Sequence, residues 1–173
     1  MKKGLVIVNT GDGKGKTTAA LGQAFRALGY AYKVCVIQFI KGTWKYGELF
    51  SKNRFEGLLD FHVMGKGFTF KSENLEEDQE MARQGWHIAK TALASDNYFM
   101  VVLDELTYLL NYQFIHIHEV VESIKNRRND LHVVITGRDC PKEILDIADL
   151  VTEMQAVKHP FKQGVKAQKG IEF

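Results

Sequence analysis

Apolar runs of strand length alternate with amphipathic stretches along most of the chain. Four runs are almost continuously hydrophobic, as expected of strands covered on both faces, and they occupy residues 5–8, 33–39, 99–105 and 132–135. Shorter strands are predicted at residues 60–64 and 150–151. Helices are predicted where apolar side chains recur at helical spacing, at residues 17–28, 74–95, 117–124 and 143–147. This order predicts an α/β fold with three layers and a mostly parallel central sheet.

The helix boundaries follow from local signals. Gly29 is expected to cap the first helix, and Asn74 followed by Glu77 resembles a capping arrangement for the second. Residues 40–48 contain two glycines and are expected to form a loop. The side chains predicted to face the core are Ala20, Ala24, Phe25 and Leu28 in the first helix and Ala82, Trp86, Ala89 and Leu93 in the second.

A glycine-rich turn joins the first strand to the first helix and has the form of a phosphate-binding loop. Glycines let backbone N–H groups converge on an anion, and the helix N-terminus favours negative charge. Lys16 and Thr17 occupy the expected lysine and Ser/Thr places, the threonine being suited to Mg²⁺. The residues predicted to bind nucleotide are Gly11, Asp12, Gly13, Lys14, Gly15, Lys16, Thr17 and Thr18.

The spacing of this loop departs from the usual Gly-x-x-x-x-Gly-Lys-Thr pattern. The first glycine should be residue 10, where this chain has Thr10, and Gly11 follows one position later. The loop is therefore expected to hold phosphates in a different geometry from that of an ordinary ATPase.

Charged residues follow two other predicted strands. Asp104 and Glu105 end one strand, and Arg138 follows another. Ligands of open parallel sheets bind at the carboxyl ends of the strands, so these residues should share an edge with the loop. The acids are candidates to hold Mg²⁺ or Mn²⁺ together with Thr17, although the spacing does not decide which acid contacts the ion. Arg138 is a candidate phosphate ligand, with a surface cap as the alternative.

Composition narrows the class of protein. The 173 residues fit one domain spanning 1–173, with 45% hydrophobic and 25% charged residues, as in ordinary globular proteins. The net charge of +2 is too small to indicate nucleic-acid binding, and no apolar stretch approaches a membrane span. The short apolar start is not followed by a cleavage site, so a cytoplasmic location is expected. Cys35 and Cys140 form neither a disulfide framework nor a zinc motif.

The segment at residues 157–173 is basic and contains glycines. A solvated tail is one interpretation. Its apolar side chains are more numerous than a tail requires, so we expect it to pack on the domain or on a partner subunit. These side chains are Phe161, Val165, Ile171 and Phe173.

Six separated motif regions, in this order, resemble those of the P-loop type of ATP:cob(I)alamin (corrinoid) adenosyltransferases. They are Gly-Asp-Gly-Lys-Gly-Lys-Thr-Thr at residues 11–18, Val-Ile-Gln-Phe-Ile-Lys-Gly-Thr-Trp at 36–44, Gly-Phe-Thr-Phe at 67–70, Val-Val-Leu-Asp-Glu-Leu-Thr-Tyr at 101–108, Ile-Thr-Gly-Arg at 135–138, and Val-Lys-His-Pro-Phe at 157–161 with Gly-Val-Lys-Ala-Gln-Lys-Gly-Ile-Glu at 164–172. The resemblance covers essentially the whole chain and implies a P-loop nucleoside-triphosphatase-like fold.

The resemblance also implies an activity. Such enzymes move the 5′-deoxyadenosyl group of ATP onto the Co(I) centre of a corrinoid, form adenosylcobalamin or another adenosylcorrinoid, and release triphosphate. They are dimeric, receive an electron from a donor such as a reduced flavoprotein, and bind ATP in the reverse sense along the loop, which agrees with the shifted glycine. By this resemblance Lys16, Thr17 and Arg138 would assist departure of the triphosphate.

The resemblance assigns the corrinoid site to aromatic residues. Phe68 and Phe70 would exclude the lower axial ligand of the cobalt, and Trp44 would also bind the corrinoid. Many relatives carry Trp where this chain has Phe70, and longer relatives have an N-terminal extension that helps to cover the corrinoid.

Two other classes of function fit a phosphate-binding loop. A P-loop ATPase or kinase would bind ATP in the usual direction and yield ADP. A regulatory nucleotide-binding module would bind ATP without turnover and would be indifferent to corrinoid and reductant.

Overall fold

The computed structural model describes residues 3–40, 46–64 and 75–173. Within them the chain forms a six-stranded sheet in the order β3-β2-β4-β5-β1-β6, and every neighbouring pair is parallel. The strands are β1 (Val6–Thr10), β2 (Val34–Gln38), β3 (Leu59–Val63), β4 (Met100–Asp104), β5 (His132–Thr136) and β6 (Leu150–Glu153). The predicted α/β class and the parallel sheet are confirmed.

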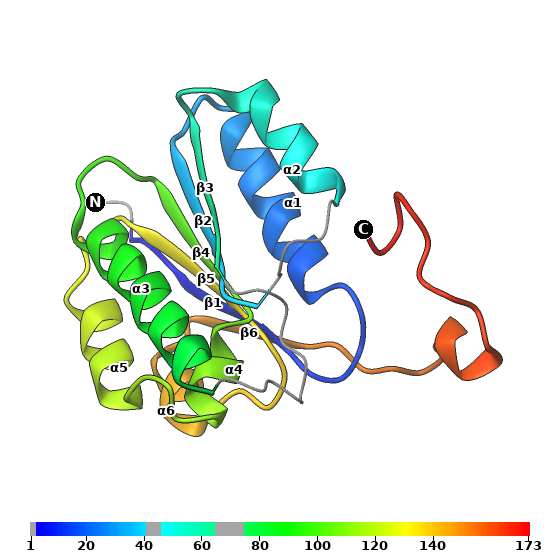
Figure 1. Ribbon diagram of the computed structural model, residues 1–173. Helices are drawn as coiled ribbons and strands as arrows, with labels where there is room; N and C mark the ends of the chain where they lie inside the picture. The colour runs from blue at the N-terminus through cyan, green and yellow to red at the C-terminus, as the bar shows by residue number, and fades with distance from the viewer. Residues whose placement is uncertain (1–2, 41–45, 65–74) are drawn as a thin grey trace.

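Helices cover both faces of the sheet, which gives the three expected layers (Figure 1). The α-helices are α1 (Lys16–Leu28), α2 (Gly47–Ser51), α3 (Leu75–Ala94), α4 (Leu106–Asn111), α5 (Ile117–Lys125) and α6 (Lys142–Ile147), and the 3₁₀ helices are η1 (Lys52–Phe55) and η2 (Pro160–Gln163). Helix α1 packs on one face, while α3 and α5 pack on the other.

Strand side chains divide between two cores because successive residues point to opposite faces. In β1, Ile7 joins the core beneath α1, whereas Val6 and Val8 join the core beneath α3 and α5. In β4, Val102 and Leu103 divide in the same way, and both are fully buried. The same alternation decides which face receives each polar residue at the carboxyl ends of the strands.

Several details of the helices differ from the sequence predictions. Phe25 does not join the core, because 66% of the residue is exposed, whereas Ala20, Ala24 and Leu28 are buried as predicted. Gly29 ends α1 with a right-handed φ of −62°, so this cap does not need a glycine for its backbone angle. Helix α4 was not predicted, and α2 begins inside the stretch that was expected to be a loop. The four side chains predicted for the core face of α3 are all buried.

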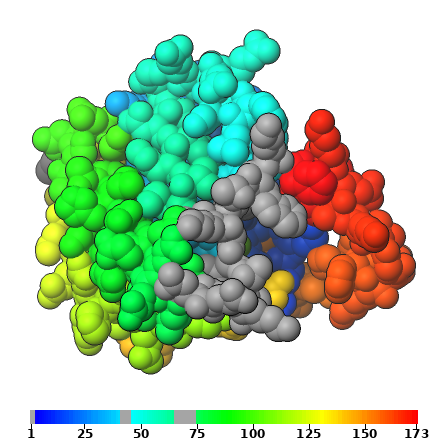
Figure 2. Space-filling view, in the orientation of Figure 1, coloured from blue at the N-terminus to red at the C-terminus, as the bar shows by residue number. Residues whose placement is uncertain are grey.

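The segment after β6 leaves the body of the domain and then turns back (Figure 1). Val157 and Phe161 are 93% and 78% exposed, so this part of the segment has little contact with the domain. Figure 2 shows a hollow between the body and this orange-to-red segment. Among the helices of the described ranges, none has the length and hydrophobicity needed to cross a lipid bilayer.

Candidate active site

The loop after β1 depends on its glycines. Gly11 has a φ of +94°, and Gly15, which precedes the first residue of α1, has a φ of +107°. Gly13 donates its backbone N–H to the Met154 carbonyl over 2.6 Å, and a Cβ atom on Gly13 would lie only 2.7 Å from that oxygen. The end of β6 and Met154, the residue after it, therefore pack directly against the loop. They leave no room for a side chain at Gly11 or Gly13.

The loop closes around its buried lysine. Lys16 is only 7% exposed, and its Nζ donates to the Gly11 carbonyl at 2.7 Å and the Gly13 carbonyl at 2.8 Å. Burial lowers the pKa of Lys16, and the negative charge of Glu105 partly opposes this effect. The arrangement places a cation inside the ring of backbone groups that would receive a phosphate.

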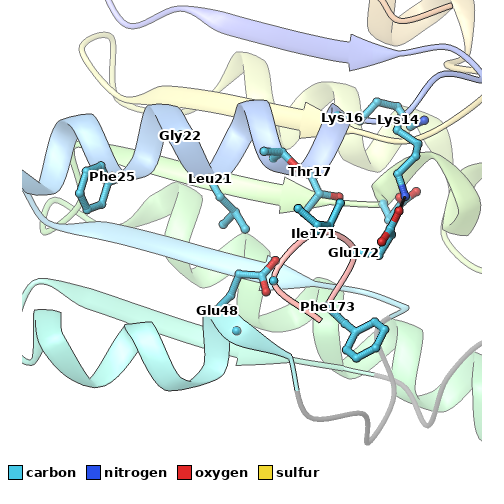
Figure 3. Close-up of a pocket in the computed structure, with 15 residues that line it drawn as sticks. Lys14, Lys16, Thr17, Leu21, Gly22, Phe25, Glu48, Ile171, Glu172 and Phe173 are labelled. Carbon is cyan, nitrogen blue, oxygen red and sulfur yellow. Dashed lines mark hydrogen bonds and ion pairs between the residues drawn. The ribbon is translucent and has the colours of Figure 1, made fainter. Parts of the chain in front are cut away.

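A cavity of about 620 Å³ opens beside the loop (Figure 3). Thr17 and Leu21 line it from α1, Glu48 lines it from α2, and Glu105 lies at the carboxyl end of β4. The returning C-terminal segment completes the lining with Gly170, Ile171, Glu172 and Phe173. One end of the cavity is thus cationic and lined by loop residues, while Leu21, Phe25 and Ile171 supply apolar surface.

Asp104 belongs to a buried polar network. It is completely buried; its Oδ1 accepts from the Thr136 hydroxyl at 2.7 Å, and its Oδ2 accepts from Gln38 Nε2 at 2.9 Å. The Gln38 Oε1 accepts in turn from the Tyr46 hydroxyl at 2.6 Å. The network spans the ends of β2, β4 and β5, and Tyr46 connects it to the start of α2.

Glu105 has a different environment, although it is the next residue. It adopts a left-handed φ of +61° immediately before α4, and its backbone N–H donates to the Thr136 hydroxyl at 2.9 Å. This conformation leaves Glu105 in the lining of the cavity that also contains Thr17. The pair of acids therefore separates into a buried carboxylate and a cavity-lining one.

Arg138 approaches the loop from the other side. Its Nη1 lies 3.7 Å from Asp12 Oδ1, and about half of its side chain is exposed. Gly137 brings it there with a φ of +141°, and Gly137 packs so close to Thr107 that an added Cβ would lie 2.0 Å from the Thr107 hydroxyl oxygen. Arg138 and Asp12 line a second cavity of about 770 Å³, with His159 and Lys162 from the C-terminal segment.

The structure brings together most of the residues predicted for nucleotide and metal. The glycine loop and Glu105 line the cavity beside Lys16, whereas Arg138 pairs with Asp12 and lines the second cavity on the other side of the loop. The corrinoid candidates Trp44, Phe68 and Phe70 lie outside the described residues. Sequence reasoning did not assign Glu48 or Glu172 to the site. No motif marks Glu48, and Glu172 was recorded only as the last residue of the motif at 164–172, without a role.

A magnesium ion can be tested against the donors of this cavity. Mg²⁺ prefers oxygen ligands and often uses few protein groups together with phosphate oxygens and water. Thr17 and Glu105 present a hydroxyl and a carboxylate to the same cavity, so the donor set fits. Within the described ranges, no group of three or more His, Cys, Asp or Glu side chains gathers as a protein-only metal site.

Residues 2–173 match the family described as ATP:corrinoid adenosyltransferase BtuR/CobO/CobP. The chain belongs to this family. It is 48% identical over 173 residues to the corrinoid adenosyltransferase of Escherichia coli K12, covering 99% of this chain and 87% of that protein. It is 47% identical, with the same coverage, to the corrinoid adenosyltransferase CobA of Salmonella typhimurium LT2.

The adenosyltransferase also resembles a solved structure of low sequence identity. The flagellar accessory protein FlaH from Methanocaldococcus jannaschii superposes with a TM-score of 0.59 at 13% identity, over 88% of this chain and 72% of that chain. This likeness concerns the fold alone. The predicted P-loop nucleoside-triphosphatase-like fold is confirmed.

Proposed function

We propose that this corrinoid adenosyltransferase transfers the 5′-deoxyadenosyl group of ATP to the Co(I) centre of a corrinoid substrate. The cobalt supplies the electron pair of the new cobalt–carbon bond, the C5′–O bond breaks, and the triphosphate leaves with that bond's electron pair. The products are an adenosylcorrinoid, such as adenosylcobalamin, and triphosphate. The main structural support is the cationic loop around Lys16, which opens into a cavity also lined by Glu105.

The leaving triphosphate determines what the protein must do. It gains negative charge as the C5′–O bond breaks, so groups that bind this charge more strongly than they bind ATP lower the barrier. Loop N–H groups, Lys16 and Arg138 serve this purpose, because they surround the same turn of backbone. A protein nucleophile is not required, because the cobalt is the attacking atom.

Thr17 and Glu105 would hold Mg²⁺ or Mn²⁺ against the phosphates. The ion supplies charge neutralisation to the polyphosphate when it is bound. Glu105 is the acid that faces the cavity, whereas both Asp104 oxygens accept hydrogen bonds from Gln38 and Thr136. Asp104 then contributes to metal binding by fixing the backbone from which Glu105 extends.

The loop offers a reason for a reversed nucleotide. Thr10 stands where the usual pattern has its first glycine, and it is the last residue of β1. The first left-handed residue is Gly11, so the turn begins one residue later than in the usual pattern. A later turn shifts the phosphate-binding N–H groups along the chain, which favours an ATP orientation different from that of ordinary ATPases.

The corrinoid site is proposed to include Trp44, Phe68 and Phe70. Apolar aromatic surface on one face of the corrin would disfavour the axial ligand that opposes reduction to Co(I). A reduced flavoprotein is the proposed electron donor, and a homodimer of single-domain chains in the cytoplasm is the proposed working form. The exposed apolar residues Val157 and Phe161 support contact between the C-terminal segment and a partner subunit.

An anaerobic incubation tests the proposal. The purified protein is mixed with ATP, Mg²⁺ and chemically reduced cob(I)alamin, and the cobalt spectrum and phosphate products are followed. We expect a light-sensitive cobalt–carbon bond and one equivalent of triphosphate. The appearance of ADP and phosphate without an adduct would instead identify an ATPase, and ATP binding without turnover would identify a regulatory module.

A further inference from the structure

The C-terminal segment contacts the phosphate-binding loop through one ion pair. Glu172 Oε1 lies 2.9 Å from Lys14 Nζ, and its Oε2 accepts the backbone N–H of Gln168 at 2.7 Å. Gly170 donates its N–H to the Phe173 carbonyl at 2.7 Å, which closes the turn around Glu172. Each oxygen of this carboxylate therefore has a defined partner, one from the loop and one from the segment itself.

The pair lies where a nucleotide would bind. Lys14 and Glu172 both line the 620 Å³ cavity, and Figure 3 shows their side chains pointing toward one another. The second loop lysine, Lys16, donates to the carbonyls of Gly11 and Gly13. The two cations of the loop thus both bind oxygen atoms of the protein itself.

Glu172 carries a full negative charge at neutral pH. The backbone N–H of Gln168 lowers the pKa of this carboxyl, and Lys14 lowers it further. A polyphosphate brings several negative charges to the same cation. The carboxylate and the phosphates would repel one another if both stayed at the loop, so they compete for Lys14.

We infer that Glu172 is an affinity-determining residue of the nucleotide site: it occupies Lys14 as an internal anion and leaves when the triphosphate of ATP binds. This inference rests on the proposed function, because it assumes that the loop receives the triphosphate. Ion pairs at the surface are weak enough to exchange, and this pair is open to solvent on the lysine side, with 45% of the Lys14 side chain and 17% of the Glu172 side chain exposed. Binding of ATP then moves the segment around Ile171 and Phe173 away from the loop.

The substitution Glu172→Gln tests the inference because it removes the charge and keeps the shape. The amide oxygen can still accept the Gln168 N–H. Equilibrium binding of MgATP without corrinoid should show a dissociation constant about two- to five-fold lower than that of the wild type at low salt, the range expected from an exposed ion pair. The difference should shrink at high salt, because screening weakens exposed charges.

Two further variants test whether Glu172 changes ATP affinity through Lys14. Glu56→Gln removes an exposed acid that does not line the cavity, and it should leave the dissociation constant unchanged. In a Lys14→Met background, Glu172→Gln should lose its effect on ATP binding, since the competition acts through Lys14. A gain that persists in this background would overturn the inference, as would unchanged or weaker ATP binding by Glu172→Gln alone.

The outcomes separate this inference from the proposed function. If the wild type binds ATP, Lys16→Ala does not, and Glu172→Gln gains nothing, only the role of Glu172 is overturned. If the wild type does not bind MgATP, the proposed nucleotide site and the role of Glu172 are both overturned.

Discussion

The Thr136 hydroxyl donates to Asp104 Oδ1 over 2.7 Å and so joins the carboxyl ends of β5 and β4 inside the protein. The same hydroxyl oxygen accepts the backbone N–H of Glu105. One side chain therefore satisfies the buried acid and positions the acid that faces the cavity. This double contact leads to the first prediction.

Thr136→Val should lower the free energy of unfolding by about 1–3 kcal/mol, since it removes a buried hydroxyl that donates to Asp104 and accepts from the Glu105 N–H. Urea denaturation monitored by circular dichroism measures this loss. Thr152→Val is the matched control, because Thr152 lies on the exposed strand β6, and its effect should stay within about 0.5 kcal/mol. Equal stability of the two variants would contradict the structural importance of the contact.

The two neighbouring acids should respond differently to neutralisation. Glu105→Gln should reduce adenosyl transfer about a hundred-fold or more while the melting temperature stays close to that of the wild type, because Glu105 lines the cavity. Asp104→Asn should lower the free energy of unfolding by about 1–3 kcal/mol. The NH2 group of the new amide would face a donor, either Gln38 Nε2 or the Thr136 hydroxyl, and one hydrogen bond would be lost. Thermal unfolding and turnover, measured on both variants, separate the two roles. A stable, inactive Asp104→Asn protein would place the metal on Asp104.

Lys16→Ala should abolish turnover with little loss of fold, because this lysine supplies charge to the phosphates and its ammonium donates to the loop carbonyls of Gly11 and Gly13. The loss of triphosphate release should be about a hundred-fold or more. Lys125→Ala, at an exposed position on α5, is the control and should keep full activity. Retained transfer by a folded Lys16→Ala protein would exclude Lys16 from phosphate binding.

The same lysine predicts a pH dependence. Burial lowers the pKa of Lys16, so the free protein loses this charge at a lower pH than an exposed lysine with a pKa of about 10.4. ATP affinity should therefore be full on the acidic side of the lowered pKa and fall as the pH rises through it. Titration of MgATP binding between neutral and alkaline pH measures the midpoint. A midpoint at or above that of an exposed lysine would contradict the effect of burial.

Substitution of the aromatic residues should separate the two substrates. The double variant Phe68→Ala and Phe70→Ala should lose cobalamin adenosylation and keep the MgATP dissociation constant of the wild type, since the loop around Lys16 is intact. Equilibrium binding and the cobalt spectrum under reducing conditions give the two readouts. Unchanged adenosylation by this variant would make both phenylalanines dispensable for the corrinoid.

Much of the fold was predictable because continuous apolar runs mark the strands and apolar residues at helical spacing mark the helices. Helix α4 was missed because Leu106 follows Asp104 and Glu105 directly, with no glycine or proline to mark the start of a new element. The exposure of Phe25 was missed because helical spacing places it near Ala24, although the structure leaves it at the rim of a cavity. Local patterns define a helix better than they define what lies beside it.

For the site, the sequence predicted which edge of the sheet carries it but not the contacts between its side chains. The rule for parallel sheets brings the loop, Asp104 and Arg138 to one side, but the division between the two acids depends on partners from other strands. Gln38 and Thr136 are separated from Asp104 by 66 and 32 positions in the sequence. The ion pair of Glu172 with Lys14 spans 158 positions. Such pairings arise from tertiary structure. The motifs that contain these residues mark their positions along the chain but do not say which side chains contact one another.

The hydrogen-bonded chain from Tyr46 through Gln38 and Asp104 to Thr136 also predicts where backbone amide hydrogens exchange slowly. Three strand ends are joined there by side chains as well as by backbone ladders, and the Glu105 amide hydrogen is bound in the same network. Deuterium should replace this amide hydrogen slowly, even though its residue borders a substrate cavity. Rapid exchange is expected instead in the exposed segment that includes Val157 and Phe161. The acidic edge is therefore expected to stay fixed under conditions in which the exposed segment moves freely.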